Sequence, residues 1–146
     1  MTKFSDNNED INITTLFVVE DDDVDFKTLM RAMKKRKITN PVIRAYDGLE
    51  ALEMLKKNEI PKPFIMLVDL QMPRMSGSEL LQKIRQEDEL KTNVVFILTT
   101  SQDVNDIRQS YENQVAGYFL KDDAEQSIFR VVDAIDAYWN IVQLPR

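Results

Sequence analysis

The sequence of 146 residues contains no cysteine and no histidine, and it has only three glycines. Without cysteine, the chain can form no disulfide, no thiolate zinc site and no cysteine nucleophile. Without histidine, it lacks the commonest general base and the commonest transition-metal ligand, and it cannot carry phosphohistidine. No G-x-G-x-x-G motif or Walker-type phosphate loop is present, so the main support for a dinucleotide-binding or nucleotide-hydrolysing protein is missing.

Long apolar runs are missing as well. The longest are the length of a strand, so we expect no transmembrane helix. Residues 1–13 are polar and acidic and lack the apolar core of a signal peptide, so they are expected to form a flexible arm on a cytoplasmic protein. The net charge of −6 argues against a nucleic-acid partner, because such proteins normally present a basic face.

What the chain does contain is a regular alternation of strand-like and helix-like segments. The strand-like runs are 15–19, 41–46, 64–68, 94–98 and 116–120. Each is followed by a helix-like segment; these begin near Asp22, Asp47, Ser76, Val104 and Asp123. The fourth helix-like segment is expected to turn Val104, Ile107 and Tyr111 toward the core.

Strict alternation of five strands and five helices indicates an α/β fold with a parallel sheet covered on both faces. Residues 14–146 are long enough for a single domain that ends in a helix and a short tail. Two strand orders are common for such sheets, Rossmann-like and flavodoxin-like, and both bind ligands beyond the carboxyl ends of the strands.

Carboxylates follow the first and third strand-like runs. Glu20 and Asp21 end the first run, and Asp69 follows the third. In a flavodoxin-like order these strands are neighbours, which would put the three carboxylates in one crevice. Carboxylates that close repel one another unless a cation lies among them, and oxygen ligands favour a hard ion. The pattern therefore predicts a small Mg²⁺ site.

A threonine and a lysine end the fourth and fifth strand-like runs. Because the strands are parallel, Thr99 and Lys121 are expected at the same rim as the acids. A hydroxyl and an ammonium beside carboxylates and a divalent cation can bind a phosphoryl group, which leaves Asp69 free to attack in line.

Each of these residues also has an ordinary structural interpretation. Asp21 and the acids after it could stabilise a helix N-terminus, and Asp69 could be a turn residue. Thr99 could be a plain strand residue and Lys121 a salt-bridge partner. Taken singly, the ordinary interpretation is the better one for Thr99 and for Lys121. Four strand ends that carry compatible chemistry together favour the phosphoryl site.

Four stretches resemble a known family. They are Val18–Asp22 (VVEDD), Val68–Gly77 (VDLQMPRMSG), Ile97–Thr100 (ILTT) and Gly117–Lys121 (GYFLK). With these motifs in this order, the chain resembles the two-component response-regulator receiver family over about residues 14–140. The resemblance implies a flavodoxin-like (βα)5 three-layer sandwich with five parallel strands. Through its C-terminal tail, the chain is also loosely similar to receivers partnered with bacterial phytochromes.

The resemblance implies a phosphoacceptor and a set of metal ligands. Asp69 would accept the phosphoryl group. Asp21 would bind Mg²⁺ directly, Glu20 would help through a water molecule, and the backbone carbonyl of Gln71 would be a further ligand.

The resemblance also implies a switch. Thr99 would hydrogen-bond the phosphoryl group and move on activation, and Tyr118 would turn inward when Thr99 moves. Lys121 would pair with the phosphorylated aspartate. Gln71 and Ser101, each two residues past a site residue, would tune how long the phosphoryl group survives.

The implied function is signalling rather than enzymatic turnover. A sensor histidine kinase would supply the phosphoryl group, and output would pass through protein–protein contact, with homodimerisation through the C-terminal face as a further hypothesis. Two alternatives remain: a binding module that works without phosphorylation, and a Mg²⁺-dependent phosphatase with an aspartyl-phosphate intermediate. The phosphatase is less favoured, because Gln71 stands where such enzymes carry a second acid. Asp122 replaces the proline that usually follows the family's lysine, so a different loop path is expected there.

Overall fold

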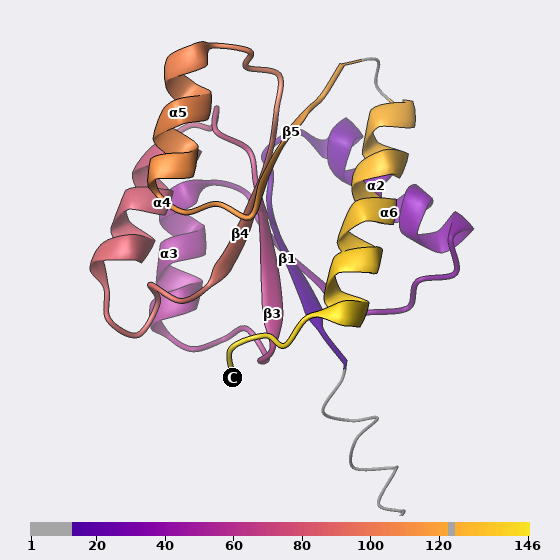
Figure 1. Cartoon of the computed structure of the whole chain (residues 1–146), viewed down its shortest axis with the longest axis horizontal. Coiled ribbons are helices and arrows are strands. Elements are labelled where there is room, and N and C mark those ends of the chain that lie inside the picture. The colour runs from indigo at the N-terminus through magenta and orange to yellow at the C-terminus, as the bar shows by residue number, and fades with distance from the viewer. Residues whose placement is uncertain (1–12, 123–124) are drawn as a thin grey trace, which may run out of the picture.

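The computed structural model describes residues 13–122 and 125–146, in which strands and helices alternate (Figure 1). The elements are β1 (Thr15–Val19), α2 (Asp23–Lys35), β2 (Val42–Ala45), α3 (Gly48–Lys56), β3 (Phe64–Val68), α4 (Gly77–Gln86), β4 (Val94–Thr99), α5 (Val104–Glu112), β5 (Gly117–Leu120) and α6 (Glu125–Ile141). The arm expected over residues 1–13, Ile13 apart, and the helix start expected at Asp123 lie outside the described residues.

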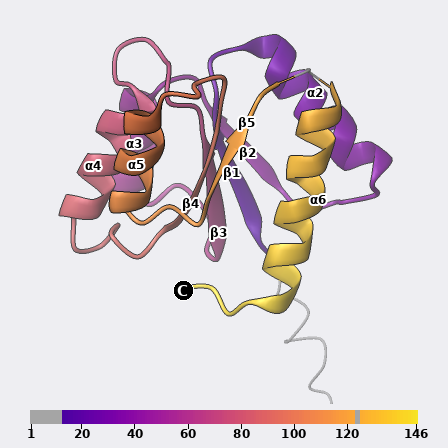
Figure 2. The same ribbon diagram turned by 45° about the horizontal axis from the view of Figure 1, so that its top comes forward.

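The strands form one parallel sheet in the order β2-β1-β3-β4-β5. Helices α3, α4 and α5 cover one face, and α2 and α6 cover the other (Figures 1 and 2). This confirms the flavodoxin-like three-layer sandwich. The reversal of strand order falls between β1 and β3, so a crevice is expected where those strands end.

The central strands are apolar throughout because both of their faces are buried. All five residues of β1 and all five of β3 are buried. Along β1 the side chains alternate between two cores: Phe17 packs under α3 and α4, whereas Leu16 and Val18 pack under α2 and α6. A sheet held this firmly on both sides gives the strand ends fixed positions.

Several predicted boundaries differ from the structure by one or two residues: β2 spans Val42–Ala45, β4 extends to Thr99 and β5 begins at Gly117. Helix α2 ends at Lys35 and cannot continue through Lys37, because Lys37 has a left-handed backbone with φ 59°. Strand β2 begins at Val42 rather than Pro41, whose carbonyl still accepts a hydrogen bond from the backbone of Leu16.

The predicted inward face of α5 is wrong for two of its three residues, whereas the third, Ile107, is half-buried. Val104 and Tyr111 are 67% and 52% exposed, and Ser110 is the buried residue of this helix. The hydroxyl of Ser101, in the preceding loop, donates to Asp106 at 2.6 Å, which holds the Asp106 side of the helix toward the sheet. Val104 and Tyr111, seven positions apart, therefore share the opposite, solvent side. In other helices Met30 and Leu49, apolar residues at helical spacing from buried ones, are exposed too.

The C-terminal tail covers part of its own core. Trp139 is buried among the residues packed under α6, and Leu144 packs against the same cluster. Ile141, between them, is 82% exposed. The tail thus folds back in part and leaves one apolar side chain uncovered. Among the described residues, no helix combines the length and apolarity needed to span a membrane.

Candidate functional site

The register of β1 and β3 places two acids side by side. Val19 pairs with Val68, so Glu20 and Asp69 come next on neighbouring strands. The amide of Asp69 donates to the carbonyl of Val19 at 3.1 Å, which continues the ladder to the sheet edge. The position of both carboxylates is therefore fixed by backbone pairing rather than by a flexible loop.

The register of β4 and β5 places the threonine and the lysine at the same edge. Thr99 pairs with Leu120, and the amide of Lys121 then donates to the carbonyl of Thr99 at 2.8 Å. This edge lies at the top of Figure 1, where β5 runs out toward the start of α6. We call it the carboxyl edge, and the opposite end of the sheet the amino edge.

Glu20, Asp21 and Asp69 form the acidic cluster that the sequence predicts. One carboxylate oxygen from each lies within 4.8 Å of the others. Glu20 and Asp69 are buried, at 4% and 8% exposed, whereas Asp21 faces solvent. The cluster therefore has an inner wall of two fixed carboxylates and an open side.

Lys121 reaches into this cluster and contacts three carboxylates. Its Nζ lies 2.7 Å from an oxygen of Glu20, 2.9 Å from one of Asp25 and 3.1 Å from one of Asp69. Sequence reasoning missed Asp25, which lies in the first turn of α2, where an acid is ordinarily ascribed to the helix dipole. Asp21 precedes the N-cap of α2, so helical spacing does not relate it to Asp25, and the sequence carries no signal that distinguishes Asp25 from an ordinary first-turn acid.

The charges at the site do not balance. Burial raises the pKa of Glu20 to about 7, even though the bond from Lys121 lowers it. Burial lowers the pKa of Lys121, but its bonds to Glu20 and Asp25 outweigh this and leave the pKa above its ordinary value. One ammonium thus faces Glu20, Asp25, Asp69 and the nearby Asp21. An all-oxygen set with excess negative charge suits a hard divalent cation.

Thr99 and Tyr118 meet at the loop after β4. Thr99 is completely buried, and its hydroxyl accepts a long 3.4 Å bond from the amide of Ser101. The hydroxyl of Tyr118 donates to the carbonyl of Ser101 at 2.9 Å, and burial raises the pKa of this phenol. All three predicted residues therefore belong to one connected group.

The loop after Asp69 is closed tightly by Gly77. The Gly77 amide donates to the carbonyl of Leu70 at 2.9 Å. A Cβ at position 77 would overlap the backbone of Asp69, so only glycine fits at this point. Within the loop, the amide of Gln71 donates to the Asp69 carboxylate at 3.1 Å, which brings the backbone of Gln71 next to the acidic cluster. The different path expected after Lys121 falls mainly on residues 123–124, outside the described residues.

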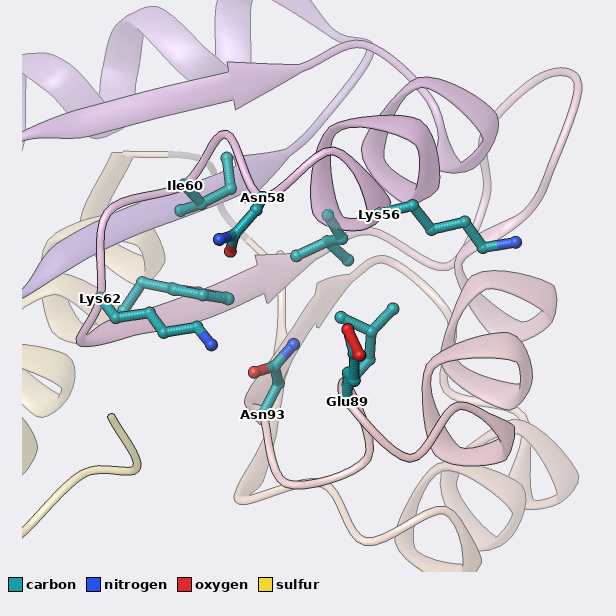
Figure 3. Close-up of a pocket in the computed structure, with 9 residues that line it drawn as sticks. Lys56, Asn58, Ile60, Lys62, Glu89 and Asn93 are labelled. Atoms are coloured by element: carbon teal, nitrogen blue, oxygen red, sulfur yellow. The ribbon is translucent and has the colours of Figure 1, made fainter.

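A separate cavity of about 290 Å³ opens at the amino edge (Figure 3). Lys56, Asn58, Lys62, Glu89 and Asn93 surround it above an apolar floor. None of the predicted site residues lines this cavity. The cavity and the acidic cluster therefore lie at opposite ends of the sheet.

Comparison with known proteins agrees with this geometry. Residues 16–133 match the response regulator receiver domain. Response regulator Rcp1 of Synechocystis sp. is 33% identical over 135 residues, which cover 89% of this chain and 92% of that protein. The probable methanogenesis regulatory protein FilR2 of Methanothrix harundinacea is 32% identical over 127 residues, covering 85% of this chain and 82% of FilR2.

Solved structures give the same result. The Mn²⁺-bound form of response regulator Rcp1 has a TM-score of 0.81 at 32% identity and covers 90% of this chain and 99% of its own. The phosphorylated cyanobacterial phytochrome response regulator RcpA has a TM-score of 0.82 at 29% identity, with coverage of 90% and 98%. The chain belongs to the response regulator receiver family of two-component signalling.

Proposed function

We propose that the protein accepts a phosphoryl group on Asp69 from a sensor histidine kinase and signals through protein–protein contact. The observation that carries this proposal is the position of Asp69. Its carboxylate ends a central strand, lies 3.1 Å from the ammonium of Lys121, and stands within 4.8 Å of Glu20 and Asp21. Contact between the folded receiver domain and another protein is the proposed output.

A divalent cation, Mg²⁺ in our proposal, fits the donor set of the acidic cluster. Asp21 and Asp69 would hold it directly, Glu20 would act through water, and the backbone carbonyl of Gln71 would complete the protein ligands. When bound, it would neutralise negative charge on the phosphoryl oxygens. The Mn²⁺-bound form of Rcp1 supports a divalent site in this family.

The chain's own residues divide the transfer between them. An oxygen of Asp69 forms a bond to phosphorus while the bond from phosphorus to the kinase's histidine nitrogen breaks, and the electron pair stays on that nitrogen. Lys121 binds a phosphoryl oxygen, and the hydroxyl of Thr99 donates to another. Movement of Thr99 would then draw Tyr118 with it through the loop that contains Ser101, which makes this group the proposed switch.

Access of water to the phosphorylated aspartate is the proposed basis of its lifetime. Gln71 is exposed beside Asp69, and its side-chain oxygen accepts a 3.4 Å bond from Thr100. Ser101 is held by its bond to Asp106. These are the two positions that we propose control that access.

The test is chemical labelling of the full chain with acetyl phosphate or phosphoramidate and Mg²⁺, followed by intact mass. The wild-type protein should gain one phosphoryl group, and Asp69→Asn should gain none. Asp88→Asn, which changes an exposed acid far from the site, is the matched control and should label like the wild type. Labelling retained in Asp69→Asn would refute the assignment.

The alternatives predict other outcomes. A module that works without phosphorylation would show no adduct with any donor. A phosphatase would release phosphate from esters over many turnovers, which the side chain of Gln71 in place of an acid argues against. We also propose a cytoplasmic location and contact between two copies through the C-terminal face. A monomeric mass in light scattering, with and without a phosphoryl analogue, would contradict that contact.

A further inference from the structure

Arg44, in the middle of β2, is held in an unusual setting at the carboxyl edge. Its guanidinium carbon lies 4.5 Å from the ring centre of Phe26 and 4.0 Å from that of Tyr46. The side chain is only 12% exposed, and Nη2 lies 2.9 Å from a carboxylate oxygen of Asp23. Nε donates to the backbone carbonyl of Glu20 at 3.0 Å. The buried Nη2 makes no hydrogen bond within the described residues, so its contact with Asp23 is an ion pair only.

That bond acts on a peptide unit shared by two proposed metal ligands. The carbonyl of Glu20 and the amide of Asp21 belong to the same planar peptide group. A hydrogen bond that fixes the carbonyl therefore also fixes the orientation of the Asp21 amide. Glu20 is also anchored by its own amide, which donates to the carbonyl of Ala45 at 3.0 Å. Asp21 is exposed, and its placement therefore depends on the backbone that carries it.

The residues directly after Arg44 hold the other loop of the site. Asp47 is buried, and its carboxylate accepts a 2.7 Å bond from Nε of Arg74. The amide of Gly48 donates to the carbonyl of Met75 at 3.0 Å, and a Cβ on Gly48 would lie only 2.5 Å from that oxygen. Arg74 and Met75 belong to the loop that presents the carbonyl of Gln71.

We propose that residues 44–48, the β2–α3 corner, position both loops that carry the metal ligands without contacting the metal. Arg44 sets the loop after β1, and Asp47 with Gly48 sets the loop after β3. This inference rests on the proposed function, because it concerns the same metal site. It adds a positioning role for side chains outside the acidic cluster.

Charge alone would predict the opposite effect of losing Arg44. Removing a cation near an acidic cluster strengthens the attraction for another cation. Loss of positioning weakens binding, because the carboxylates are no longer held in place. Lysine keeps the charge but has neither the planar face that stacks between two rings nor an Nε donor. Arg44→Lys and Arg44→Met therefore separate positioning from charge.

The experiment is titration of the metal-free full chain with Mn²⁺ in a calorimeter. Arg44→Lys and Arg44→Met should each bind Mn²⁺ roughly tenfold more weakly than the wild type, the low end of the range for outer-shell partners of metal ligands. Arg31→Lys is the matched control, since Arg31 pairs with Glu125 between α2 and α6, and it should bind like the wild type. Unchanged affinity in Arg44→Lys, or tighter binding in Arg44→Met, would overturn the positioning role.

A second readout needs no metal. The amide of Asp22 donates to the Glu20 carboxylate at 3.1 Å, and its hydrogen exchange reports how firmly the loop after β1 is held. Exchange at Asp22 should be faster in Arg44→Lys than in the wild type at equal global stability. Equal exchange rates would contradict the proposal even if Mn²⁺ binding had changed.

The outcomes distinguish this inference from the function beneath it. A wild-type protein that does not bind Mn²⁺, or binds it equally well after Asp21→Asn, would refute the metal site itself. If the wild-type protein binds Mn²⁺ and Arg44→Lys binds it equally well, the positioning role of the β2–α3 corner is refuted and the metal site is not. Should the Arg44 variants not fold, Asp47→Asn tests the other half of the corner. It keeps the helix cap but weakens the contact with Arg74, and unchanged Mn²⁺ affinity would count against the proposal.

Discussion

The two ends of the sheet treat their polar side chains differently. At the carboxyl edge, Lys121 contacts three carboxylates between 2.7 and 3.1 Å, and backbone pairing fixes Glu20 and Asp69. At the amino edge there is more empty volume, but Asn93 holds a buried Nδ2 that has no hydrogen-bond partner among the described residues. Convergence of charge, rather than the size of a cavity, therefore distinguishes the edge that carries the chemistry.

Replacing one lysine by methionine at each edge should give the largest difference in phosphorylation rate. Lys121→Met removes the ammonium that we propose binds a phosphoryl oxygen, and phosphorylation by phosphoramidate should slow about 100-fold, as for loss of one preorganised donor. Lys62→Met at the amino edge should leave the rate unchanged. Rates come from intact mass over time at fixed Mg²⁺. Similar slowing in both variants would break the distinction between the edges.

Replacing the unpaired asparagine at the amino edge should change the free energy of unfolding and leave phosphorylation unaffected. Asn93→Leu removes a buried donor without a partner, which should stabilise the fold by about 1 kcal/mol or more. Asn113→Leu is the matched change of an asparagine whose Nδ2 does donate, to the carbonyl of Gln109, and it should give no gain. Urea unfolding measures both. A destabilised Asn93→Leu would mean that the amide has a role at that edge.

The smallest effect is expected in acid. The hydrogen bond from Arg74 holds the pKa of Asp47 below its usual 3.8. A carboxyl whose pKa is lower in the folded state adds stability above its usual pKa, and this is lost as pH falls through the folded value. Asp47→Asn should therefore unfold at lower urea than the wild type at neutral pH, and the difference should vanish once the pH has fallen below the folded pKa of Asp47. Asp103→Asn makes the same substitution at another helix N-cap, that of α5, and is the comparison variant in the same urea experiment. A difference that persists in acid would assign the effect to something other than charge.

Much of the fold could be predicted because burial on both faces leaves a clear pattern. The bounds predicted for β1 and β3 agree with the structure, since both are continuous apolar runs. The rotation of α5 could not be predicted from apolar spacing, because it turns Ser110 toward the sheet and is accompanied by a hydrogen bond from Ser101 to Asp106.

The candidate site was predictable to the extent that it lies at strand ends. Glu20, Asp69 and Lys121 each follow a strand directly, so the sheet alone brings them together. Asp25 and Arg44 were not found, because Asp25 lies within a helix and Arg44 within a strand, and their contacts depend on how those elements pack. The residues that follow a strand can be predicted from the sequence. The side-chain contacts between packed elements cannot.

The lysine at the centre of the site comes from far along the chain. Lys121 lies 101 positions from Glu20 and 52 from Asp69. A protein is synthesised from its N-terminus, so the acidic residues emerge well before the cation that they contact. Until β5 joins the edge of β4, the carboxylates have no ammonium among them. The phosphoacceptor site that we propose is therefore complete only after the last strand has been synthesised and has paired with β4.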